Sequence, residues 1–155
     1  MSRPRGGAVT KTRRAPRQAS RQAALQVLFA LDLAPVGALA EEVFERVSDN
    51  FDLPEGARAF AKQLVCGVIA ERDEIDAALA RVSRHWRLPR MAAVDRNVLR
   101  LGAYEILRTD APAAVAIDQA VELARRFGAE GSPGFVNGVL DAVAREAGRA
   151  EDRPG

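Results

Sequence analysis

The stretch from residue 91 to 108, MAAVDRNVLRLGAYEILR, constrains the fold of this chain more than any other. At 100° per residue its large apolar side chains fall on one broad arc, which predicts a helix buried over most of its circumference. Arg96 and Arg100 lie one turn apart on the remaining side, where we expect solvent. The apolar arc consists of Met91, Val94, Val98, Leu99, Leu101 and Ile106, with Gly102 inside it.

Two carboxylates break the pattern of this helix. Asp95 and Glu105 fall within or beside the apolar arc, where an unpaired charge is costly. Each therefore needs a partner, either inside the chain or on another molecule. An internal salt bridge, or a helix edge that reaches water, explains the pattern equally well.

The composition favours helices throughout the chain. Aromatic residues make up only 5% of the sequence, hydrophobic residues 48%, and Ala, Leu, Arg and Glu are abundant. A length of 155 residues suits one compact domain, so we predict an all-α bundle of about six to seven helices. The expected helices span 16–33, 38–50, 54–83 as either one helix or two with a bend near 72–74, 91–108, 115–127 and 132–146.

Charge divides the chain into a basic arm and an acidic body. Residues 1–21 hold seven of the 23 basic residues and none of the 21 acidic ones, so residues 22–155 carry 16 basic against 21 acidic residues. The arm has few apolar side chains and is suited to neutralising phosphates, although a merely solubilising tail has the same composition. We expect a flexible basic arm over 1–15, one domain over 16–148 and a disordered tail over 149–155.

The first predicted helix continues the basic arm. Arg14, Arg17 and Arg21 recur at spacings of three and four residues, which predicts one basic stripe on the solvent side. Guanidinium groups on such a stripe reach phosphates and stack on exposed bases. An ordinary solvated helix face gives the same pattern.

The sequence offers no catalytic or metal-binding constellation, and we expect no enzyme activity, metal or cofactor. The only histidine, His85, has no Cys, Asp or Glu at ligand spacing, and Trp86 is expected to pack in the core. The single cysteine, Cys66, lies in an apolar run and is predicted to be a buried thiol. No apolar run is long enough to span a bilayer and no signal peptide is evident, which predicts a cytoplasmic protein without a membrane partner.

Four segments together resemble the NusB family of bacterial transcription antitermination factors. They are RQAALQVLFALD (21–32), VDRNVLRLGAYEIL (94–107), VAIDQAVELARRFG (115–128) and FVNGVLD (135–141), and the similarity extends in order from about Arg17 to Asp141. Separate motifs with matching spacing make this resemblance more specific than any single motif would be.

The resemblance implies an all-helical protein that is not an enzyme. Members of the family bind the single-stranded boxA element of ribosomal RNA transcripts as a heterodimer with the ribosomal protein NusE. The heterodimer joins RNA polymerase and other Nus factors in an antitermination complex. The free protein is expected to be a monomer or a homodimer.

The resemblance also implies site residues. Phe135 would stack on a base, unless it is a core residue, and Asn137 would read a base edge, unless it caps the turn at Gly128. A basic ribosomal protein would supply the counter-charge that Asp95 lacks. The implied RNA-binding residues are Arg13, Arg14, Arg17, Arg21, Arg100, Phe135 and Asn137, and the implied partner-binding residues are Phe29 and Asp95.

Two alternatives stay open at this point. One is the NusB-like RNA-binding domain of ribosomal RNA cytosine methyltransferases, against which the chain shows no glycine-rich cofactor loop or catalytic cysteine motif. The other is a helical adaptor that binds only protein. A steep loss of affinity with added salt would distinguish an RNA binder from such an adaptor.

Overall fold

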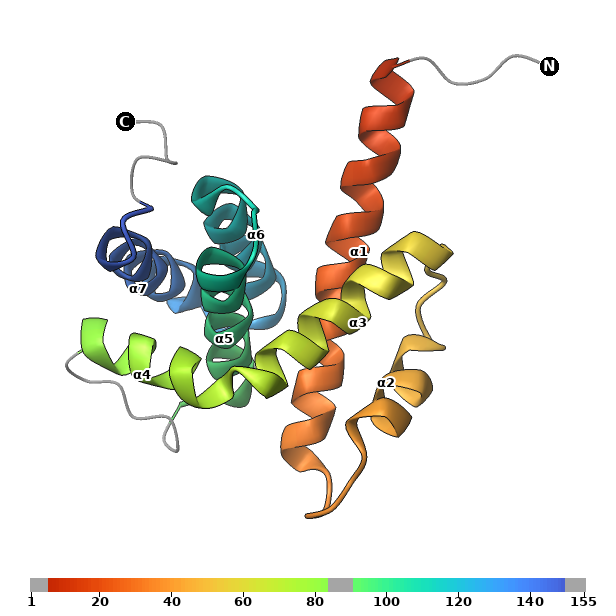
Figure 1. Cartoon of the computed structure of the whole chain (residues 1–155), viewed down its shortest axis with the longest axis horizontal. Coiled ribbons are helices and arrows are strands. Elements are labelled where there is room, and N and C mark those ends of the chain that lie inside the picture. Colours follow the sequence, from red (N-terminus) through yellow and green to blue (C-terminus); the bar gives the residue numbers. More distant parts are fainter. Residues whose placement is uncertain (1–5, 84–90, 150–155) are drawn as a thin grey trace. The chain divides into compact units, whose positions relative to one another are not determined.

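The computed structural model describes residues 6–83 and 91–149, with side chains from residue 17 onward, and in these segments it is helical with no strand (Figure 1). The predicted all-α fold is confirmed. The expectations for His85 and Trp86 lie outside the described residues. The helices are α1 (Gly6–Leu33), α2 (Ala40–Ser48), α3 (Glu55–Ala70), α4 (Arg72–Val82), α5 (Ala93–Arg108), α6 (Ala113–Phe127) and α7 (Ser132–Glu146).

The sequence predicted one domain, whereas the chain divides into two compact units, Met1–Gln63 and Leu64–Gly155. The division falls inside α3, so this helix contributes residues to both units. Each unit buries apolar side chains of its own helices.

The first unit is built from α1, α2 and the first half of α3. Helix α1 packs against α2 and begins at Gly6, ten residues before the predicted start at Pro16. Proline inside a helix lacks the N–H donor and its ring crowds the carbonyl group of the residue four positions earlier, so Pro16 lowers the stability of α1, but the helix continues through it. The core of this unit consists of Ala23, Ala24, Leu25, Val27 and Leu28 of α1, Val43 and Phe44 of α2, and Ala57 and Ala61 of α3.

The second unit surrounds α5, as the pattern of residues 91–108 predicted. Helices α4, α6 and α7 all pack against α5, and every residue from Asn97 to Ile106 is buried. The largest fully buried side chains of α5 are Leu99, Leu101 and Ile106. Burial on all sides leaves no solvent-facing strip along this part of the helix. Arg100 is therefore buried as well, as described below.

Helices α3 and α4 are two helices, separated at Glu71. The predicted burial of Cys66 in α3 is wrong, because its thiol-bearing side chain is exposed. At 100° per residue, Cys66 lies about 200° around the helix from the buried Leu64 and Val68, which places it on the opposite side.

Close packing within the second unit depends on glycine at two helix positions. A Cβ atom at Gly67 of α3 would lie 2.1 Å from Cζ of the buried Tyr104 of α5. At Gly102 of α5, a Cβ atom would lie 2.5 Å from Cδ1 of Leu140 in α7. Neither position has room for a side chain, so at each one the side chain of the neighbouring helix packs directly against the glycine backbone.

Helix α7 ends in a glycine-based cap that fixes the following residue. Gly148 has a positive φ of 76°, and the N–H of Arg149 donates to the carbonyl oxygen of Ala144 at 2.7 Å, which is a Schellman arrangement. The Arg149 guanidinium donates to the carbonyl oxygens of Ile106 and Ala111 at 2.6 and 2.7 Å. Arg149 therefore satisfies two carbonyl groups around the α5–α6 connection.

No helix in the part of the chain that the structure describes is both long and apolar enough to cross a membrane.

Candidate functional site

Two of the predicted RNA-binding arginines, Arg17 and Arg21, lie where α1 crosses α3 in the first unit. The hydroxyl of Ser20, fully buried, donates to the carbonyl oxygen of Ala57 at 2.7 Å. Ala24 and Ala61 are also fully buried, and such small side chains let two helices approach closely. This crossing fixes the position of the next turn of α3, which carries Phe60.

Two arginines of α1 contact the ring of Phe60. The guanidinium carbon of Arg17 lies 4.5 Å from the ring centroid and that of Arg21 lies 5.5 Å away, both within the range of cation–π attraction. Arg17 is exposed, but Arg21 is only 4% exposed. The prediction that Arg21 faces solvent is therefore wrong, since this side of α1 faces α3. The side chains of Arg13 and Arg14 lie outside the described residues.

The prediction that Arg100 faces solvent is also wrong. Its side chain is 4% exposed, and its Nε and Nη2 donate to the two carboxylate oxygens of Asp76 in α4 at 2.9 and 3.0 Å. The helical pattern alone placed Arg100 opposite the apolar arc, but α4 covers that side and supplies the counter-charge. A guanidinium held in this way has no free fork for a phosphate.

The turn before α7 exposes an aromatic side chain. Phe135 is 40% exposed, so it is not a core residue in this structure. The preceding turn is closed by Ser132, whose hydroxyl accepts a hydrogen bond from the N–H of Ala129 at 3.0 Å. In the described residues Ser132 thus takes the place expected for Asn137, which is half-buried.

A second exposed aromatic on the other side of this turn was not predicted as a site residue. Phe127, the last residue of α6, is 37% exposed, and the guanidinium carbon of Arg126 lies 5.7 Å from its ring centroid. At 100° per residue, Phe127 falls on the same face of α6 as the buried Ala120 and Ala124. Its partial exposure depends on how the helix end packs, which periodicity does not reveal.

The two residues predicted to bind a protein partner are described separately, because they belong to different units. Phe29 is a half-buried residue of α1. Asp95 lies in the first turn of α5, where its Oδ1 is buried and has no hydrogen-bond partner in the described part of the chain. A buried carboxylate oxygen without a hydrogen-bond partner is costly.

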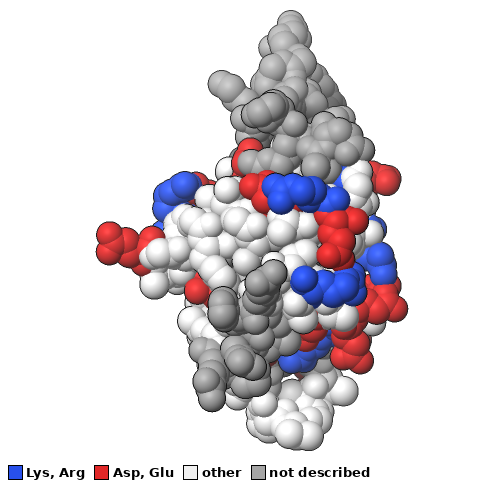
Figure 2. Space-filling view, turned by 90° about the vertical axis from the view of Figure 1, so that its left-hand side faces the viewer, with Lys and Arg blue, Asp and Glu red and all other residues white. Residues whose placement is uncertain are grey.

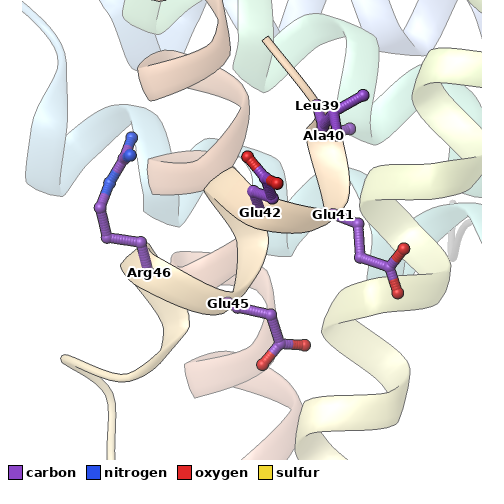
Figure 3. Close-up of a pocket in the computed structure, with 6 residues that line it drawn as sticks. All are labelled: Leu39, Ala40, Glu41, Glu42, Glu45 and Arg46. Carbon is purple, nitrogen blue, oxygen red and sulfur yellow. The ribbon is translucent and has the colours of Figure 1, made fainter.

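Helix α2 presents an acidic surface with a shallow hollow of about 730 Å³ (Figure 3). Glu41 is paired with Lys62 of α3 and Glu45 with Arg58, whereas Glu42 makes no ion pair among the described residues. This surface would repel a phosphate backbone. The hollow is lined by Leu39, Ala40, Glu41, Glu42, Glu45 and Arg46.

Several charged residues of the second unit form ion pairs with one another. On the face shown in Figure 2, basic and acidic side chains lie next to each other beside an uncharged area. Arg108 of α5 is paired with Glu71 and Glu74. The hydrogen bond from Arg108, followed by hydrogen bonding with Glu71, lowers the pKa of the Glu74 carboxyl. The described residues contain no group of three or more His, Cys, Asp or Glu that is placed to hold a metal.

Comparison with known proteins links this arrangement to one family. The sequence profile of the NusB family matches residues 18–145. The chain is 48% identical over 139 residues to the transcription antitermination protein NusB of Sorangium cellulosum, covering 87% of this chain and 96% of that protein. It is 41% identical over 138 residues to the protein of the same name in Desulfitobacterium hafniense, covering 88% and 93%.

Solved structures agree with the sequence comparison. A structure of T. maritima NusB matches with a TM-score of 0.79 and 36% identity, covering 88% of this chain and 95% of that one. A crystal structure of the antitermination factors NusB and NusE in complex with double-stranded RNA contains a chain that matches with a TM-score of 0.75 and 30% identity, covering 85% and 98%.

Proposed function

This chain belongs to the NusB family, and on that premise we propose that it is a transcription antitermination factor that binds RNA together with a NusE protein. The observation that carries the proposal is the match, over most of both chains, to a NusB that was solved with NusE and RNA. Membership in a family of antitermination proteins also supports a binding function without catalysis. Action on nascent transcripts would place the protein in the cytoplasm.

The residues proposed to bind RNA differ from those that the sequence implied, and each unit contributes its own. In the first unit, Arg17 is the described cationic residue, because it is exposed on α1 and its charge is not paired with a carboxylate in the described segments. In the second unit, Phe135 offers an exposed ring for base stacking, and the half-buried Asn137 of the same helix offers a side-chain amide. Arg13 and Arg14 extend the positive charge of the sequence toward the N-terminus. Arg100 is left out because Asp76 occupies its guanidinium.

We assign Phe29 and Asp95 to the protein partner. The unsatisfied Oδ1 of Asp95 is suited to a donor from a basic protein such as a ribosomal protein. The acidic excess of residues 22–155 favours the same kind of partner through long-range attraction. We therefore expect an Asp95→Asn variant to lose affinity for NusE, while Arg17→Ala keeps it.

The RNA target is proposed to be the boxA element of ribosomal RNA transcripts. The test is fluorescence anisotropy with labelled single-stranded boxA RNA, a scrambled single strand and a double-stranded probe, each titrated with the full chain in the presence and absence of NusE. We expect the full chain to prefer boxA, to bind it more tightly with NusE, and to lose affinity steeply with added salt.

Two single arginine variants provide a matched comparison for this test. Arg17→Ala should weaken RNA binding, whereas Arg46→Ala, which removes an exposed arginine from the acidic surface of α2 in the same unit, should not. If binding ignores RNA sequence and partner alike, or if both arginine variants weaken it equally, the chain is a generic polyanion binder and the proposed function is wrong.

A further inference from the structure

We propose that Phe60 is a positioning residue, whose ring holds the exposed guanidinium group of Arg17 ready to stack on an unpaired base of RNA. The inference rests on the proposed function and adds to it a residue of α3 that is not among the predicted site residues. Three observations carry it: the fixed position of the ring, the different exposure of its two arginine neighbours, and the unneutralised charge of Arg17.

A buried contact fixes the part of α3 that carries the ring against α1. Phe60 lies three residues after Ala57, on the same side of α3, and Ala57 accepts the 2.7 Å hydrogen bond from the fully buried Ser20. Ala61, next to Phe60, is itself fully buried. The half-buried ring therefore stands at a defined place beside α1.

Only one of the two arginines beside the ring is open to a ligand. Arg21 is nearly buried, so it adds positive charge but little accessible surface. Arg17 contacts the ring at 4.5 Å and is exposed to solvent. A guanidinium that rests against an aromatic ring can accept a base on its remaining face while its edge donates to a phosphate.

Among the described residues, no carboxylate neutralises the charge of Arg17. Several other arginines do form an ion pair with a carboxylate, among them Arg58, Arg81, Arg108 and Arg125. Among the described residues, Arg17 has the ring of Phe60 as its neighbour and no such carboxylate. An aromatic ring orients the side chain without neutralising it, so the ligand needs to displace no acid. Restricting a flexible arginine before binding also reduces the entropy cost of binding.

The preferred ligand is a single strand. In a duplex the bases are stacked on one another, whereas an unpaired base has a free face for a guanidinium plane. The class of ligand is therefore an unpaired nucleotide, with its base on Arg17 and its phosphate at the guanidinium edge.

The test is a double-mutant cycle in the full chain with single-stranded boxA RNA. Phe60→Leu keeps an apolar side chain but removes the ring face, and Phe60→Tyr keeps the ring. We expect Phe60→Leu to weaken RNA binding roughly two- to fivefold, the range of an exposed cation–π contact, and Phe60→Tyr to bind as the unchanged chain does. In the Arg17→Ala background, Phe60→Leu should weaken binding no further.

A second measurement keeps the inference testable if Phe60→Leu folds poorly. The ring should shift the NMR resonances of the Arg17 side chain in the unchanged free protein, and RNA should move them again. An unshifted Arg17, unchanged affinity in Phe60→Leu, or an equal loss in both backgrounds would each overturn the positioning role. Failure of the unchanged chain to prefer boxA would overturn the proposed function instead, and failure to bind any single strand would overturn both.

Discussion

Breaking the buried pair between Asp76 and Arg100 should destabilise the protein more than removing an exposed pair. Asp76→Ala leaves a guanidinium group that is 4% exposed without its two hydrogen-bond acceptors. Loss of one partner from a buried pair costs about 3–5 kcal/mol. The Asp76 side chain is 20% exposed, so water can reach the site. We therefore expect the loss of stability to lie at the lower end of this range, at about 3 kcal/mol. For a chain of this length that lowers Tm by roughly 6–12 °C.

The assay is guanidinium chloride denaturation followed by far-UV circular dichroism. The control is Arg81→Ala, which removes an exposed pair with Glu146 and should cost at most about 1 kcal/mol. Replacing both partners, by Asp76→Leu with Arg100→Met, should restore stability to within about 1 kcal/mol, because no buried charge is left. Equal losses in Asp76→Ala and Arg81→Ala, or a double variant as unstable as Asp76→Ala, would refute this reasoning. The double variant should also bind RNA normally.

Three further predictions follow from the described packing. Gly67→Ala should lower the free energy of unfolding by about 1–3 kcal/mol, because the added Cβ would overlap the ring of Tyr104. Gly138→Ala, in an open position of α7, should raise the free energy of unfolding by about 0.5–1 kcal/mol. Thermal denaturation in which both variants change stability in the same direction would contradict this packing. The lowered pKa of Glu74 stabilises the fold above the pKa that this carboxyl has when unfolded, and the stabilisation is lost as the pH falls through the folded-state pKa. Unfolding measured against pH should therefore show Glu74→Gln to be less stable than the unchanged chain near neutral pH and equal to it in acid, and a gap that widens in acid would show that the sign is wrong. Cys66 should react with a thiol reagent in the native protein as fast as in the denatured one, and strong protection would contradict its exposure.

Sequence periodicity predicted the helices well because each one has its own apolar pattern. The central helix and the last helix lie within two residues of their predicted bounds. The last helix begins at Ser132, with Gly131 as its N-cap, and Pro133 lies in its first turn, where proline is favoured by local backbone geometry. The start of α1 was missed because proline indicates a helix start but does not require one.

Exposure of charged residues was harder to predict than the helices themselves. Arg21 and Arg100 lie opposite apolar residues on their own helices, yet neighbouring helices cover them. A helical pattern reports which residues can share a face but not how many faces are covered. Phe60 was missed for a related reason: its two cationic neighbours come from another helix, and no local spacing indicates such a contact.

The contact between Gly67 and Tyr104 also limits the order in which this protein can evolve. Any side chain at position 67 would overlap the ring of Tyr104. If Tyr104 is replaced first by a smaller residue, space opens beside Gly67. The opposite order passes through an overpacked intermediate that selection for stability would remove. Among descendants of this sequence, position 104 is therefore expected to change before position 67, and a lineage that has accepted a larger residue at 67 could not easily regain the tyrosine.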